Sequence, residues 1–164
     1  YEICACLVGS EMCIRDSNEL IVEFLDMVEN HKMIVENSGL LTVAALKHLD
    51  VKDKKVVSIL SGGNMDVITM SSIVRHGLIQ RGRVFSMSVL LPDKPGELLK
   101  VAKVIADAKG NVIKIDHNQF VSINRNAAVE LGITLEAFGM EHKEEILNAM
   151  RKAGYNPKII QTTM

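Results

Sequence analysis

A serine, two glycines and an asparagine occupy positions 61 to 64, directly after a short apolar run. That run, Val56 to Leu60, is rich in β-branched residues and predicts a β-strand, and a helical pattern follows Asn64. A strand that ends in this way places polar side chains at the rim of a sheet, where open α/β folds bind their ligands. Ser61-Gly62-Gly63-Asn64 therefore predicts a ligand site, with a plain strand-to-helix turn as the alternative. It lacks the lysine and spacing of a nucleotide P-loop.

The other residue types that could do chemistry show no pattern of a metal site. The five histidines form no i,i+4 pair or cluster. Cys4, Cys6 and Cys13 lack C-x-x-C spacing and have no histidine nearby, so we predict no metal. Because residues 1–17 differ in composition from the rest and show no clear period, we interpret them as a foreign segment.

Composition excludes several classes of protein. The chain has 164 residues, 48% of them hydrophobic, and a formal net charge of -1. Interspersed charges give no basic stripe for nucleic acid, and no apolar run reaches the length of a membrane span. Residues 18–164 contain no cysteine, which suits a reducing compartment, and we expect a cytoplasmic location.

Residues 18–82 are predicted to be mostly helical. The expected elements are, in order, a helix over 18–30, a helix over 40–49, the strand over 56–60 and a helix over 66–76 that ends at Gly77. Asn64 or Asp66 can cap the last helix, because a short polar side chain accepts hydrogen bonds from the free amides of a first turn. One strand cannot build a sheet alone, so this order is typical of the closing part of a doubly wound α/β domain.

Residues 83–164 form a pattern that is complete in itself. The expected elements are a strand over 84–91, a helix after Pro95-Gly96, strands over 112–117 and 128–138, a helix over 141–153 and a strand over 155–160. This βαββαβ order predicts a ferredoxin-like sandwich. The whole chain is therefore predicted to be α/β, with domains over 18–82 and 83–164.

Two groups of residues together resemble a known family. Ser61-Gly62-Gly63-Asn64 resembles the closing motif of fold-type II pyridoxal-phosphate enzymes, the tryptophan synthase β-like group. The segment from Arg75-His76-Gly77-Leu78 to Gly82-Arg83 resembles threonine dehydratase (threonine ammonia-lyase), and Leu91-Pro92-Asp93-Lys94-Pro95-Gly96 resembles an ACT domain. Glu36-Asn37-Ser38-Gly39 is similar to a family segment beside the cofactor. The resemblance runs from Asn18 to the end of the chain.

The resemblance implies a lyase that eliminates water from threonine, and often from serine, to give a 2-oxo acid and ammonia. Ser61 would place its hydroxyl on the pyridine nitrogen of pyridoxal phosphate, and a neutral partner there makes the ring a weaker electron sink, which suits β-elimination. Gly62 and Gly63 would let the backbone pass close to the ring. Glu36 would lie near the edge of the ring, with a solvent-facing carboxylate as the alternative.

An ACT domain implies an amino-acid effector, bound at the turn before its first helix and at the strand that follows. The matching residues are Pro95, Gly96 and Asn111, and free amides at this turn could hold a carboxylate. A purely structural turn is the alternative. Because the edges of small sheets are often covered by a second copy, we expect a homo-oligomer.

No residue of this chain matches the Schiff-base lysine or the glycine-rich phosphate cup of the family. The lysines between 32 and 55 stand in charged or turn contexts, unlike the buried apolar pocket that activates a lysine. We therefore predict no catalytic residue here and no activity of the isolated chain. Two alternatives stay open: an amino-acid-binding or dimerisation module, and a serine racemase or serine dehydratase. The resemblance implies isoleucine biosynthesis as the metabolic role, with a catabolic role as the alternative.

Overall fold

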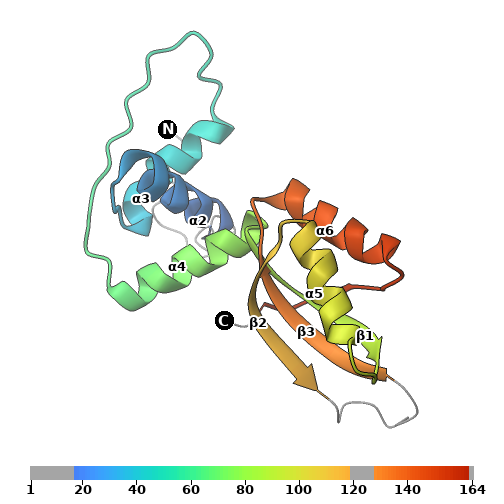
Figure 1. Ribbon diagram of the computed structural model, residues 1–164. Helices are drawn as coiled ribbons and strands as arrows, with labels where there is room; N and C mark the ends of the chain where they lie inside the picture. Colours follow the sequence, from blue (N-terminus) through green and yellow to red (C-terminus); the bar gives the residue numbers. More distant parts are fainter. Residues whose placement is uncertain (1–16, 119–127, 163–164) are drawn as a thin grey trace. The chain divides into compact units, whose positions relative to one another are not determined.

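The computed structural model of the chain describes residues 17–118 and 128–162 (Figure 1). It separates into two compact units, Tyr1–Gly77 and Leu78–Met164. The three cysteines lie outside the described residues, and so does the segment over 119–127, between the strands predicted over 112–117 and 128–138. Among the residues that are described, no helix is long and apolar enough to cross a membrane.

The first unit is built from helices, as its sequence pattern predicts. In chain order they are α2 (Ser17–Asp26), the π-helical turn η2 (Met27–His31), α3 (Asn37–Ala45), the 3₁₀ turn η3 (Leu46–His48) and α4 (Val67–Gln80). Their apolar faces meet in one core that contains Leu20, Phe24, Met27, Val35, Leu40, Ala44 and Ile73. This small core holds the loops that carry the candidate ligand site.

The predicted end of α4 at Gly77 is wrong, because the helix continues to Gln80. Gly77 is buried inside the helix, and a Cβ there would lie 2.5 Å from Cδ1 of Leu25 on α2. The glycine therefore permits close packing of α4 against α2. A glycine in a sequence can mark either the end of a helix or a position where two helices pack closely, and Gly77 is of the second kind.

The predicted strand over 56–60 is also absent from the structure. Residues 54 to 66 have neither helical nor strand structure and connect η3 to α4 (Figure 1). A strand needs a neighbour to receive its backbone hydrogen bonds, and the described part of the first unit contains no other strand. The run retains one packed side, since Leu60 is partly buried against the core.

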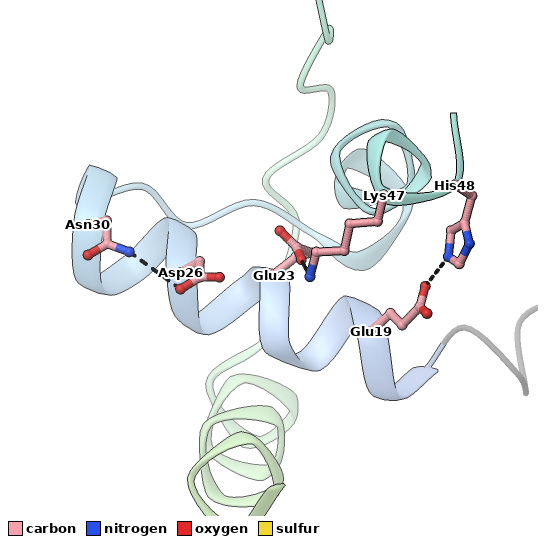
Figure 2. Close-up of polar contacts among 6 residues, drawn as sticks. All are labelled: Glu19, Glu23, Asp26, Asn30, Lys47 and His48. Carbon is pink, nitrogen blue, oxygen red and sulfur yellow. Dashed lines mark hydrogen bonds and ion pairs between the residues drawn. The ribbon is translucent and has the colours of Figure 1, made fainter. Parts of the chain in front are cut away.

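Two acid–base pairs tie α2 to η3 (Figure 2). The Lys47 ammonium pairs with the carboxylate of Glu23, whose side chain is only 7% exposed. Glu19 lies one turn before Glu23 on α2, and its Oε2 is 2.8 Å from His48 Nε2. Both of these side chains are well exposed. Burial makes the first pair the more consequential of the two.

The second unit is a four-stranded antiparallel sheet with two helices. Its elements are β1 (Val84–Pro92), α5 (Glu97–Asp107), β2 (Asn111–Asn118), β3 (Ala128–Glu136), α6 (Met140–Lys152) and β4 (Lys158–Ile160). The strand order is β2-β3-β1-β4. The predicted βαββαβ ferredoxin-like fold is thus confirmed.

Alternation along the strands creates the core of this unit. On β1, Phe85, Met87, Val89 and Leu91 face the helices, and their β3 partners in the register are Leu135, Ile133, Leu131 and Val129. From α5 come Val101 and Ile105, and from α6 come Ile146, Leu147 and Met150. Both helices therefore cover one face of the sheet.

Candidate functional site

The structure brings the predicted cofactor residues of the first unit together. The segment before α3, residues 36–39, lies against residues 61–62 in the connection to α4. A Cβ on Gly39 would lie 2.0 Å from the backbone oxygen of Ser61, and a Cβ on Gly62 would lie 2.1 Å from Glu36 Oε1. Segments some 25 positions apart in the sequence thus meet at two glycines, where no side chain fits between them.

Glu36 shapes this contact through its backbone and its side chain. Its carbonyl accepts hydrogen bonds from the amides of Gly39 (3.0 Å) and Leu40 (3.2 Å), which starts α3. Its carboxylate accepts the hydroxyl of Ser38 and lies beside Gly62, whose φ of +84° favours glycine. The carboxylate is therefore half-buried at the contact and is held by its own loop.

Ser61 presents an exposed hydroxyl at this place, and no described residue forms a hydrogen bond with it. Gly63 differs from its neighbour, because a Cβ there would meet no atom within 4 Å. The structure thus requires a glycine at 62 for local reasons but not at 63. Space beside Gly63 is what a nearby ligand would need.

Hydrogen bonds hold the apolar run before Ser61 along α3. The Thr42 hydroxyl donates to the Ile59 carbonyl (3.2 Å), and the Ser58 hydroxyl donates to the Thr42 carbonyl (3.4 Å). The opposite side of the run is exposed to solvent: the exposed fraction is 86% for Val57 and 74% for Ile59. Such side chains normally lie inside a protein.

The cap of α4 is Asp66, one of the two predicted candidates. Its Oδ1 accepts the amides of Ile68 and Thr69, both at 2.9 Å, and its Oδ2 accepts the Thr69 hydroxyl. These hydrogen bonds, those from Thr69 first, lower the pKa of the Asp66 carboxyl from its ordinary value. Asp66, rather than Asn64, therefore starts the helix that follows the candidate site.

In the second unit, Pro95 and Gly96 line a cavity of about 310 Å³ beside the turn that precedes α5. Its apolar lining includes Leu91, Leu98, Val129 and Leu131, and its charged or titratable lining consists of Asp93, Lys94, Glu97 and His117. Gly96 has a φ of +91° and is the residue before the helix. A cavity with an apolar floor and a polar rim can hold a small amphipathic molecule.

Asn111, the third predicted effector residue, does not line this cavity. It is the first residue of β2, after the other end of α5, and its side-chain amide donates to Glu136 Oε2 at 3.1 Å. Within one chain the structure therefore brings two of the three predicted residues together. His117 was missed, because a lone histidine near the end of a strand carries no signal of its own.

A larger cavity of about 700 Å³ lies where α5 ends and α6 begins. Phe138, Met140 and Glu145 are among its lining residues, and so is His142, whose ring stacks on Phe138 with centroids 4.7 Å apart. His142 accepts the Phe138 amide at Nδ1 (3.0 Å), and its Nε2 lies 2.7 Å from the Ala108 carbonyl oxygen. The imidazole is thus used as a structural bridge. Within the described residues no cluster of metal-ligating side chains occurs.

Comparison with known proteins gives the relationship of the chain. It is 35% identical over 147 residues to an L-threonine ammonia-lyase of Geobacter sulfurreducens. The matched residues cover 88% of the chain and 37% of that relative. It is 32% identical over 151 residues to an L-threonine ammonia-lyase of Thermotoga maritima, covering 92% of the chain and 38% of the relative. The chain is related to threonine ammonia-lyases. It spans somewhat over a third of their length, and no family model matches it.

The predicted resemblance to threonine ammonia-lyases is therefore confirmed across both units. Among solved structures, the chain is similar to the regulatory subunit of aspartate kinase from Thermus thermophilus. That similarity has a TM-score of 0.37 and 17% identity, over 47% of this chain and 49% of the other.

Proposed function

We propose that this chain is the C-terminal part of a pyridoxal-phosphate-dependent threonine ammonia-lyase. Residues 18–82 belong to its catalytic domain, and residues 83–164 form an ACT domain that senses an amino acid. The observation that carries the proposal is identity to threonine ammonia-lyases over about nine tenths of the chain, through both units. The meeting of Ser61 and Gly62 with Glu36 supports it.

The residues at that meeting point fit pyridoxal phosphate. Ser61 has an exposed hydroxyl that is free of any described partner. Gly39 packs against the backbone oxygen of Ser61, and Gly62 packs against the side chain of Glu36. Gly63 leaves open space beside it. When bound, pyridoxal phosphate supplies the electron sink for β-elimination. Ser61 would hold the pyridine nitrogen through a neutral hydrogen bond, with Gly62, Gly63 and Glu36 at the edge of the ring.

The lysines of the first unit are engaged elsewhere or lie at its surface. Lys47 pairs with Glu23, and Lys32 donates to the Glu29 carbonyl at 2.6 Å. Lys54 donates to the Asp50 carbonyl at 2.9 Å. None lies in the buried apolar setting that activates a lysine. We therefore assign the Schiff-base lysine to the part of the relatives that this chain does not span, and expect no turnover by the chain alone.

The bare side of residues 56–60 supports the assignment to a catalytic domain. Burying a valine or isoleucine side chain contributes roughly 1.5–3 kcal/mol, which this run does not gain here. Val57 and Ile59 would gain it against the sheet of a complete doubly wound domain, where the run would become the predicted strand. The exposed side thus fits a missing neighbour better than it fits a free surface loop.

The cavity beside Pro95 and Gly96 supports an effector site. The amides of Leu98 and Leu99 have no acceptor among the described residues, as is usual in the first turn of a helix. They can hold a carboxylate while the apolar floor receives an aliphatic side chain. Since Asn111 lies apart from this cavity, its part in effector binding would require a second copy, which agrees with a homo-oligomer. The cysteine-free body favours the cytoplasm.

A separate amino-acid-binding module is a second candidate, favoured by one observation. The second unit has its own core and its own cavity without help from the first. A chimera distinguishes the two candidates. In it, residues 18–164 replace the matching part of the Geobacter sulfurreducens relative.

We expect the chimera to release ammonia from threonine, and the isolated chain to release none and to show no absorbance change with pyridoxal phosphate. In the chimera, Ser61→Ala should lower kcat by at least about tenfold, because it removes the partner of the ring nitrogen. Ser58→Ala, whose hydroxyl bonds to the Thr42 carbonyl of α3, is the matched control and should leave kcat within about twofold. An active isolated chain, or an unaffected Ser61→Ala chimera, would contradict the proposal.

A further inference from the structure

The cavity beside α5 has one histidine among its lining residues. That residue is His117, on the edge strand β2. A histidine changes its charge between about pH 5 and 8, whereas ordinary carboxylates and lysines keep theirs. The other charged lining groups are Asp93, Lys94 and Glu97, which all come from the turn and the start of α5.

The register of the sheet fixes where His117 stands. It is paired with Leu131 on β3, and antiparallel partners lie on the same face of a sheet. Leu131 belongs to the core under the helices, so His117 lies on that face as well. The pair formed by Leu91 and Val129 lies on the same face toward the same end of the sheet. Three strands thus contribute to one cavity.

His117 also interrupts an apolar row along β2. The earlier pairs in this row join Val112 to Leu135 and Ile115 to Ile133, and all four side chains are apolar. The next pair joins His117 to Leu131, where the cavity begins. His117 itself is exposed, so its side chain belongs to the wall of the cavity and not to the packed core.

The remaining charges leave a place for a positive group. Glu97 is already paired with Lys100, whose Nζ lies 2.7 Å from Glu97 Oε1. Asp93 can face the ammonium group of an amino acid, while the free amides at the start of α5 face its carboxylate. A protonated His117 adds positive charge to the cavity and so favours binding of the amino-acid carboxylate.

We propose that His117 is a specificity-determining residue of this cavity, whose protonated imidazole attracts the carboxylate of a bound aliphatic α-amino acid. Binding then tightens as the pH falls through the range where histidine gains its proton. The inference rests on the proposed effector function and adds to it a pH-dependent regulation. The amino and carboxyl groups of a free aliphatic amino acid keep their charges over this range, so a pH dependence of binding would arise from the protein.

The test is isothermal titration calorimetry of the whole chain with L-isoleucine, L-valine and L-threonine at pH 6 and pH 8. For the wild type we expect at least one of them to bind about three- to fivefold more tightly at pH 6, the effect of one solvent-accessible charge. His117→Gln keeps a hydrogen-bonding side chain without the titration, so its affinities at the two pH values should agree. His31→Gln, an exposed histidine of the first unit, is the matched control and should keep the wild-type ratio.

Each outcome bears on a different claim. If the wild type binds none of the three amino acids at either pH, the effector function itself fails and the role of His117 fails with it. If the wild type binds but His117→Gln shows the same ratio between the two pH values, the effector function stands and the role of His117 is overturned.

Discussion

Replacing His142 tests whether its imidazole bridges α5 and α6 in the second unit. The ring accepts the Phe138 amide at 3.0 Å, lies 2.7 Å from the Ala108 carbonyl oxygen and is buried. His142→Ala removes both hydrogen bonds, at about 1 kcal/mol each. The stacking on Phe138 adds about 0.5–1.5 kcal/mol. We therefore expect His142→Ala to lower the free energy of unfolding by about 3 kcal/mol.

Two further substitutions divide this loss between the two hydrogen bonds. His142→Asn keeps an acceptor near the position of Nδ1, so of the two hydrogen bonds it should keep the one from the Phe138 amide and lose the one to Ala108. His142→Gln reaches toward Ala108 and should do the reverse. Both also remove the ring that stacks on Phe138, so each should cost about 2 kcal/mol, about two thirds of the loss in His142→Ala. Phe138→Ala is the control for stacking, because its backbone amide remains and its side chain is already 81% exposed.

Urea unfolding is followed by tyrosine fluorescence in a Tyr1→Phe background. Tyr155 is then the sole tyrosine, and it packs against the core of the second unit. Hydrogen exchange of the Phe138 amide, measured by NMR, reports the bridge directly and should quicken in His142→Ala and His142→Gln. A loss below about 0.5 kcal/mol in His142→Ala, with unchanged exchange at Phe138, would refute the bridging role.

Three further predictions test the first unit. Hydrogen bonds from the first turn of α4 lower the pKa of the Asp66 carboxyl. The ionised carboxylate therefore stabilises the folded protein above the ordinary aspartate pKa of about 4, and this stabilisation is lost as the pH falls through the lowered pKa. Asp66→Asn should therefore flatten the acid side of thermal melts followed by circular dichroism. Gly39→Ala puts a Cβ 2.0 Å from a backbone oxygen and should cost about 1–3 kcal/mol in urea unfolding, whereas Gly63→Ala, with open space, should cost almost nothing. Lys47→Ala leaves the buried carboxylate of α2 without its cation and should cost about 3 kcal/mol, against less than about 1 for the exposed His48→Ala.

The second unit was predictable from sequence because its pattern is local and repeated. Alternating apolar residues mark β1 and β3, and Pro95-Gly96 marks the start of α5. Helical spacing of apolar residues marks the first unit equally well, and α2 lies where it predicted. Such patterns reflect the geometry of one strand or one helix, which depends on nearby residues.

The errors arose where the outcome depends on distant partners. Gly77 has the residue type of a helix end, but the packing of Leu25 against it lets α4 continue. The run over 56–60 has the composition of a strand, but it has no neighbouring strand in the described part of its unit. The grouping of Asn111 with Pro95 and Gly96 stays a prediction, since α5 separates them within one chain.

The sequence by itself determined the order of the helices in the first unit, the ferredoxin-like topology of the second unit and the motif around Ser61 that resembles threonine ammonia-lyases. These follow from periodicity, turn residues and short motifs, all of which are local. Only the tertiary structure decided that Glu36 meets Gly62, that His117 joins the cavity beside Pro95, and that His142 connects two helices. Those contacts join residues far apart along the chain, and their distances are set by how helices and strands pack, which no local pattern encodes.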